Sequence, residues 1–293
     1  SPGEVAVTVN YMGQVAAVRV QVPRPDAPEI YPDLPVNNSV DPLVWGRLEK
    51  MGILPSPLSD DATFLRRVYL DTIGTLPLPT EVREFLAADD PQKRARAIDR
   101  VLERQEFADF WALKWADILL VNRETLGDRG AYEFHRWIRQ QFARNRPYDQ
   151  WVRELITATG NSAKDGPVNF FRSLRTKEEL ARAVSQAFLG VRVECAQCHH
   201  HPFEKWARQD FYGLAGYFNG LERKNIGPQR ELVYHGGLKQ TRLPVSGELV
   251  ATRPLSGDTP TDLEKGDPRV HLASWLTAPD NPWFTRLVAN RLW

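Results

Sequence analysis

The stretch that most strongly determines the fold is residues 105–121, QEFADFWALKWADILLV. Its large apolar residues include Phe107, Trp111, Trp115, Ile118 and Leu119. They recur every three or four positions, which is the spacing that places side chains on one face of an α-helix. So wide an apolar face must be buried against other elements, and ordinary aromatic core is the default interpretation. The stretch therefore predicts a long helix inside a helical core.

Other segments repeat this helical pattern along most of the chain. Asp41 followed by Pro42 is typical of a helix start, Thr80 is typical of an N-cap, and Gly190 is typical of a helix end. The predicted helical segments are 41–51, a segment after Ser59, 80–86, 91–102, 105–121, 131–142, 149–158, 177–189, 211–218 and 271–276. The predicted fold class is mainly α, with several helices.

Two regions depart from the helical pattern. Residues 5–22 are rich in β-branched residues with Gly13 between two alternating runs, which predicts a small N-terminal β-hairpin. A second, short β excursion is expected after residue 227. The predicted organisation is a hairpin at 1–25, a proline-rich linker at 26–40, a helical domain at 41–226, a β-rich excursion at 227–266 and the start of a following helical domain at 267–293. We expect the chain to be a piece of a longer protein.

The charge pattern narrows the choice of partners. The 293 residues contain 38 Lys and Arg against 37 Asp and Glu, a net charge of +1, and the two signs are interspersed. No segregated basic face that would bind nucleic acid is therefore expected. There is no apolar run of membrane-spanning length and no signal-peptide pattern at the start. We expect no transmembrane segment in this chain.

The two cysteines of the chain lie together in the run Cys195-Ala196-Gln197-Cys198-His199. Two thiols at this spacing can add across the vinyl groups of haem, while the adjacent histidine ligates the iron. The run therefore predicts one covalent haem c with His199 as the proximal ligand. A chance occurrence, a redox dithiol and part of a zinc site remain open alternatives, although a zinc ribbon would need a second ligand pair.

A longer stretch, residues 190–206, resembles the signature of the planctomycete cytochrome-c-like domain family, long classed as a domain of unknown function. His200 replaces a residue that is usually Asn in that signature, whereas His199, His201, Pro202, Phe203 and Trp206 fit it. Later runs, at 210–214 and 281–293, also resemble the family, and the N-terminal hairpin resembles the tail of a bacterial Ig-like domain. The resemblance implies a cytochrome-c-like fold with haem and no particular substrate.

Several residues around the motif are candidates for contact with the haem. They are His201, Phe203 and Trp206, with Tyr212 and Phe218 as further walls and Arg172, Arg175, Lys205 and Arg208 as partners for the propionates. The main distal-ligand candidates are His135, His271 and Met51. Met12 and His235 complete the inventory, and an open sixth position is an alternative.

The predicted function is electron transfer by a mono-haem c module within a larger multidomain protein. Its expected partners are a redox protein or a small electron donor or acceptor, together with the flanking domains. A haem enzyme or gas or redox sensor with an open distal site is one alternative, and a structural haem module is another. Haem is attached to such a motif outside the cytoplasm, so we expect an extracytoplasmic protein whose signal peptide is not in this sequence.

Overall fold

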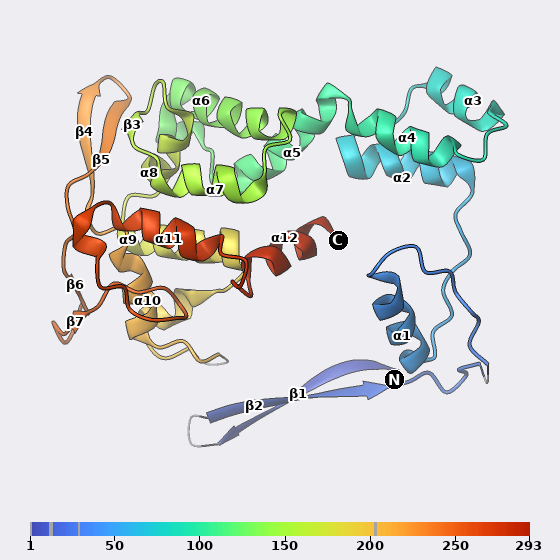
Figure 1. Ribbon diagram of the computed structural model, residues 1–293, viewed down its shortest axis with the longest axis horizontal. Helices are drawn as coiled ribbons and strands as arrows, with labels where there is room; N and C mark the ends of the chain where they lie inside the picture. The colour runs from blue at the N-terminus through green and yellow to red at the C-terminus, as the bar shows by residue number, and fades with distance from the viewer. Residues whose placement is uncertain (1, 12–13, 29, 202–203) are drawn as a thin grey trace. The chain divides into compact units, whose positions relative to one another are not determined.

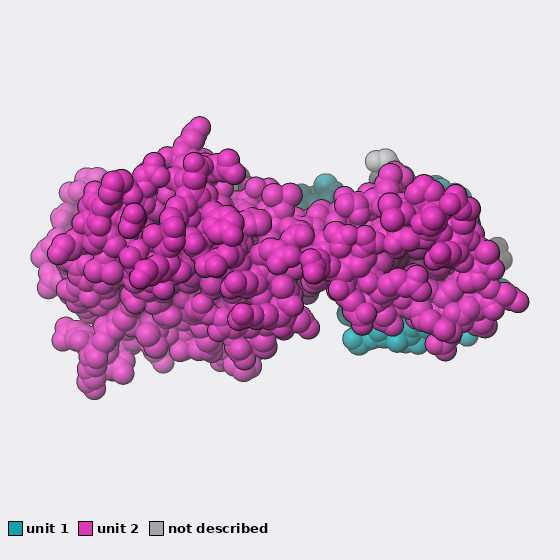
Figure 2. Space-filling model, turned by 90° about the horizontal axis from the view of Figure 1, so that it is seen from above, with its two compact units in different colours: residues 1–60, 202–204 teal, residues 61–201, 205–293 magenta. Residues whose placement is uncertain are grey.

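A computed structural model describes residues 2–11, 14–28, 30–201 and 204–293. It separates into two compact units, one of residues 1–60 with 202–204 and the other of residues 61–201 with 205–293 (Figure 2). The fold is mainly α with a small N-terminal hairpin and later strands, which confirms the predicted fold class. No helix among the described residues is long and apolar enough to cross a membrane.

The first unit contains the hairpin and one helix. The hairpin strands are β1 (Gly3–Tyr11) and β2 (Gln14–Val22). They pair antiparallel, with Val5 opposite Val20 and Val7 opposite Val18, and such β-branched pairs favour strand structure. Gly13, where the turn was predicted, and Met12 lie outside the described residues. The helix is α1 (Asp41–Met51), with the predicted proline in its first turn.

The second unit begins with a small helical cluster of α2 (Asp61–Ile73), α3 (Pro79–Ala87) and α4 (Lys93–Leu102). Helices α2 and α4 pack against each other around a core of Leu65, Tyr69, Ile73, Ala97 and Val101. The long helix predicted from residues 105–121 follows as α5 (Gln105–Ile118), and it packs on α2 as well as on α6 (Arg123–Ala143). Helix α5 therefore connects this cluster with the main core.

The main core lies among the remaining helices of the second unit (Figure 1). They are α6, α7 (Tyr148–Thr157), α8 (Phe170–Ser173), α9 (Lys177–Val184), α10 (Arg208–Gly216), α11 (Pro268–Leu276) and α12 (Phe284–Leu292). Helix α11 packs along α7, and α10 packs on α9. Helix α6 is kinked at Gly127, whose φ of 70° and ψ of 166° are not helical. A residue with a side chain rarely takes this positive φ, so the kink favours glycine.

The predicted β excursion is present and begins earlier than residue 227. Its strands are β4 (Leu221–Gly227), β5 (Arg230–His235), β6 (Thr241–Arg242) and β7 (Leu249–Val250). Strand β5 lies between β4 and the short β3 (Gly160–Asn161), and β6 pairs with β7. A short 3-10 turn, η1 (Gly166–Asn169), lies between β3 and α8, and another, η4 (Leu263–Lys265), lies between β7 and α11.

Candidate functional site

The cysteine motif follows α9, whose two ends are both determined by local sequence. Thr176 caps the start, accepting a hydrogen bond from the Glu179 amide, while the Glu179 carboxylate accepts one from the Thr176 amide. At its other end, α9 continues into η2 (Ser185–Leu189), a π-helical turn, and stops at Gly190 in the left-handed conformation, with φ of 68°. The chain therefore turns sharply just before the motif.

The motif itself begins on η3 (Val193–Gln197), a 3-10 turn packed against α9 and α10. Val193 and Ala196 are buried and hold the turn to the core. Cys195 and Cys198 are exposed free thiols on the same turn. Burial of two small apolar residues thus leaves both cysteines at the surface, where a large planar group can reach them.

His199 is also exposed, and its ring is oriented by a hydrogen bond. Its Nδ1 lies 2.6 Å from the carbonyl oxygen of His200. A carbonyl oxygen can only accept, so Nδ1 must carry the proton and the neutral ring has its lone pair on Nε2. A histidine that ligates a metal through Nε2 usually has its Nδ1 held in this way. The local geometry therefore prepares His199 for ligation through Nε2.

Two residues that follow the motif, His201 and Trp206, contact each other through their backbones. The amide of His201 donates to the carbonyl of Trp206 at 2.8 Å. Trp206 is 4% exposed, its ring lies 6.0 Å from that of Trp283, and Lys205 Nζ lies 5.1 Å from its ring centroid. Trp206 and His201 are thus joined by a backbone hydrogen bond beside the motif, their contact with haem stays a prediction, and Phe203 lies outside the described residues.

Several polar side chains lie around Tyr212 of α10, next to the motif. Burial raises the pKa of Tyr212, and electrostatic interactions with Glu178 and Cys198 also raise it. The Arg208 charge and a hydrogen bond with Gln197 lower the pKa. Arg208 Nε is buried and has no hydrogen-bond partner among the described residues. The spacing of Arg208 and Tyr212, four residues apart on one helix, is the sequence signal for this pair. The hydrogen bond between Gln197, inside the motif, and Tyr212 was not predicted.

The distal-ligand candidates lie on three different elements. His271, on α11, stacks on Tyr217, whose hydroxyl lies 3.1 Å from the histidine Nδ1. His135, on α6, is half-buried at the edge of a hollow that α5 and α6 line together. Met51 is buried at the end of α1, in the other compact unit. Which of them, if any, ligates iron stays a prediction.

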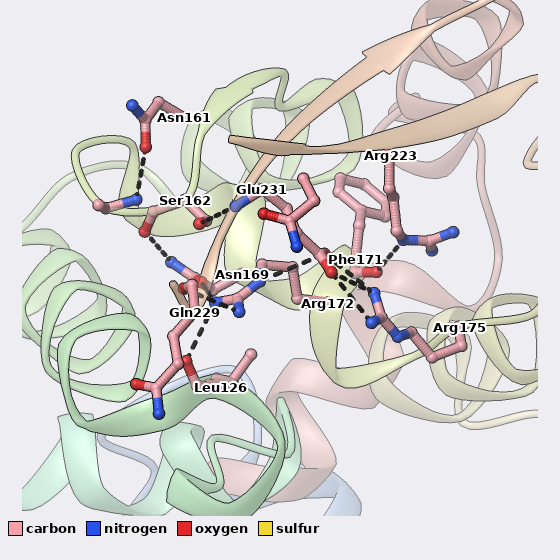
Figure 3. Close-up of polar contacts among 12 residues, drawn as sticks. Leu126, Asn161, Ser162, Asn169, Phe171, Arg172, Arg175, Arg223, Gln229 and Glu231 are labelled. Atoms are coloured by element: carbon pink, nitrogen blue, oxygen red, sulfur yellow. Dashed lines mark hydrogen bonds and ion pairs between the residues drawn. The ribbon is translucent and has the colours of Figure 1, made fainter. Parts of the chain in front are cut away.

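Arg172 and Arg175, two of the candidate propionate partners, both contact Glu231, Arg172 from a buried position and Arg175 from an exposed one (Figure 3). The Arg172 side chain is 6% exposed and donates to the backbone carbonyls of Leu126 and Gln229, each at 3.1 Å. It also lies 3.4 Å from Glu231, which Arg175 contacts with both terminal nitrogens. This cluster joins α6, α8 and β5, so we interpret it as structural.

Among the described residues, no three His, Cys, Asp or Glu side chains come close enough to hold a metal ion together. The donor set at the motif is instead two exposed thiols and one exposed imidazole. That set fits covalent attachment of haem, where the iron takes only one ligand from the motif and the thiols bind the macrocycle.

The fold and the site define a mainly α-helical protein that presents a Cys-x-x-Cys-His run on an exposed turn. Residues 39–223, well over half of the chain and including the motif, match the family model PSCyt2, described as a protein of unknown function (DUF1549). The chain belongs to this family. No curated protein sequence and no solved structure matches it.

Proposed function

We propose that this chain is an electron-transfer module that binds one haem c, and that it is related to the cytochrome-c-like proteins of planctomycetes. The observation that carries the proposal is the exposed turn on which Cys195, Cys198 and an oriented His199 occur together. Neither thiol is engaged in a disulfide, so both are available for thioether bonds. Haem is attached outside the cytoplasm, so the proposal includes an extracytoplasmic location.

Each residue has a distinct part in this proposal. Cys195 and Cys198 would anchor the macrocycle, and His199 would ligate the iron through Nε2 while the His200 carbonyl accepts a hydrogen bond from its Nδ1. When bound, haem supplies reversible one-electron uptake and release at its iron. Trp206 is buried next to the motif, and Arg208, whose Nε has no hydrogen-bond partner among the described residues, is the basic side chain that could pair with a propionate.

The experiment is maturation of the chain with haem-attachment machinery, followed by absorption spectra of the oxidised and reduced protein. We expect a c-type spectrum that survives denaturation, since thioether bonds do not depend on the fold. Cys195→Ser with Cys198→Ser should abolish haem retained after denaturation, whereas His199→Ala should alter the iron spectrum. Lys224→Ala, at an exposed position of β4 outside the motif, is the control and should leave both properties unchanged.

Two outcomes would contradict the proposal: a wild-type chain without haem, or retention that does not depend on the two cysteines. The spin state then separates the candidate functions. A low-spin, six-coordinate iron with an accessible reduction potential supports electron transfer. A high-spin iron that binds carbon monoxide would favour an open-site enzyme or sensor instead.

A further inference from the structure

The helix that leads to the cysteine motif has an unusual end. Helix α9 widens into the π-helical turn η2, and it stops at Gly190, five positions before Cys195. Turns of this kind are rare and often lie at functional sites. The carbonyls in the last turn of a helix have no amide partner within the helix. The groups that bind these carbonyls therefore determine how the helix ends, just before the motif.

Arg291, on α12, binds two of these carbonyls from far along the chain. Its terminal nitrogens donate to the Ala187 oxygen at 2.6 Å and to the Gln186 oxygen at 3.2 Å. A positive charge at the C-terminal end of a helix is stabilised by the helix dipole. The guanidinium is partly buried, and no carboxylate among the described residues lies within ion-pair distance of it. The carbonyls of η2 are therefore the polar partners of this charge.

Side chains of α5 and α12 make further contacts with η2. The guanidinium carbon of Arg291 lies 5.2 Å from the ring centroid of Trp115, and the Trp115 ring stacks on that of Phe188, in η2, at 6.3 Å. Leu287 is four residues before Arg291 and so lies on the same face of α12. A Cβ on Gly190 would lie 3.0 Å from the Leu287 side chain, so Leu287 packs against the glycine that ends the helix. Hydrogen-bonded, stacked and apolar contacts therefore hold η2 together.

The connection from η2 to the motif is short and packed. The Val191 amide donates to the Ser185 carbonyl at 3.2 Å, so the chain past Gly190 is still bonded to η2. Val191 and Val193 are buried, and the motif turn η3 begins at Val193. Closely packed segments transmit displacements, so a shift of η2 shifts η3 with it. The position of the motif turn therefore depends on what holds η2.

We propose that Arg291 is a positioning residue for the cysteine motif: it caps the π-helical end of α9 and thereby fixes the turn that carries Cys195, Cys198 and His199. Its hydrogen bonds go to η2 and not to the motif, so it acts through the helix end. The consequence for haem rests on the proposed function, because the orientation of His199 matters only where it ligates iron. The consequence for the turn does not, and it is measured on the chain without haem.

The first test is hydrogen–deuterium exchange, measured by mass spectrometry on the full chain without haem. Arg291→Met keeps an apolar stem beside Trp115 but removes both donors. We expect backbone exchange in the segment 186–199 to become about tenfold faster, the factor for losing a charged hydrogen bond that holds one local segment. Segments of α6 and α7 should exchange as in wild type. Arg291→Lys, which keeps the charge, should restore part of the protection, and Arg286→Met, at an exposed position of the same helix, should change nothing.

Thr176→Ala separates positioning of the motif from a simple loss of stability. It removes the cap at the other end of α9, so it weakens the same helix without touching η2. Exchange at 195–199 should stay as in wild type. Unchanged exchange at 186–199 in Arg291→Met, equal acceleration throughout the chain, or the same acceleration at 195–199 in Thr176→Ala would overturn the proposal.

The second test is electron paramagnetic resonance of the haem-loaded chain. Wild type should show one iron species, whereas Arg291→Met should show at least two, because His199 is no longer held in one orientation. An identical, single species in both proteins would overturn the positioning of His199. A wild-type chain that acquires no haem would refute the proposed function, whereas the exchange experiment would still decide whether Arg291 positions the turn.

Discussion

Replacing Arg172 should destabilise the second unit strongly, because its guanidinium is the centre of a buried polar cluster (Figure 3). Arg172→Met keeps much of the side-chain volume but removes the donors to the carbonyls of Leu126 and Gln229. The Leu126 carbonyl is buried, and leaving it without this partner costs about 1–3 kcal/mol, whereas Gln229 is exposed and its carbonyl can turn to water. Glu231 keeps Arg175 as a partner, so its charge is not left unpaired. We therefore expect a loss of about 2–3 kcal/mol, mainly from the donors removed at the buried end of the cluster.

The matched control is Arg175→Met, which removes a second partner of the same Glu231. The Arg175 side chain is 59% exposed, against 6% for Arg172. An exposed ion pair contributes about 0–1 kcal/mol, so this variant should stay close to wild type. Urea denaturation followed by near-ultraviolet circular dichroism gives the free energy of unfolding for both. Equal losses in the two variants, or a loss below about 1 kcal/mol for Arg172→Met, would refute a structural role for the cluster.

Three further predictions concern local features. Burial raises the pKa of both Tyr148 and Tyr217 above the usual 10, so the folded state holds these protons more tightly than the unfolded state. The contribution of these two tyrosines to stability is complete below pH 10 and is lost as the pH rises through their raised pKa values. An ultraviolet titration in which all eight tyrosines ionise before the protein unfolds would contradict this. Gly190→Ala should cost about 1–2 kcal/mol in thermal or urea unfolding, because φ is 68° and the new Cβ would lie 3.0 Å from Leu287; an unchanged midpoint would be the contrary result. Thr176→Ala should cost about 1 kcal/mol by removing the cap of α9, and Thr176→Ser, which keeps the hydroxyl, should restore most of it.

Helix positions could be read from the sequence because their signals are local. The proline after Asp41 and the apolar period of residues 105–121 correspond to α1 and α5. The kink of α6 was missed, because nothing in the neighbouring sequence indicates that Gly127 takes a positive φ within the helix. The start of β4 at Leu221 was also missed, since its pairing with β5 determines it more than its own composition does.

The site shows the same division between local and distant information. The cysteine motif is contiguous, so its composition alone identified the residues that lie together on the exposed turn. The true partner of Arg172 could not be read in this way, because Glu231 is 59 residues away on a strand. A cleft lined by Trp111, Phe142 and Tyr148 could not be predicted either, since these rings come from separate helices and each alone is typical of core.

The most direct test of haem attachment is the intact mass of the chain after maturation with the attachment machinery, followed by proteolysis and mass analysis of the peptide that contains Cys195 and Cys198. We predict a single addition equal to the mass of one haem, located on that peptide and lost when both cysteines are replaced by serine. A peptide of unmodified mass, from a protein matured beside a known c-type cytochrome that does acquire haem, would contradict the proposed function.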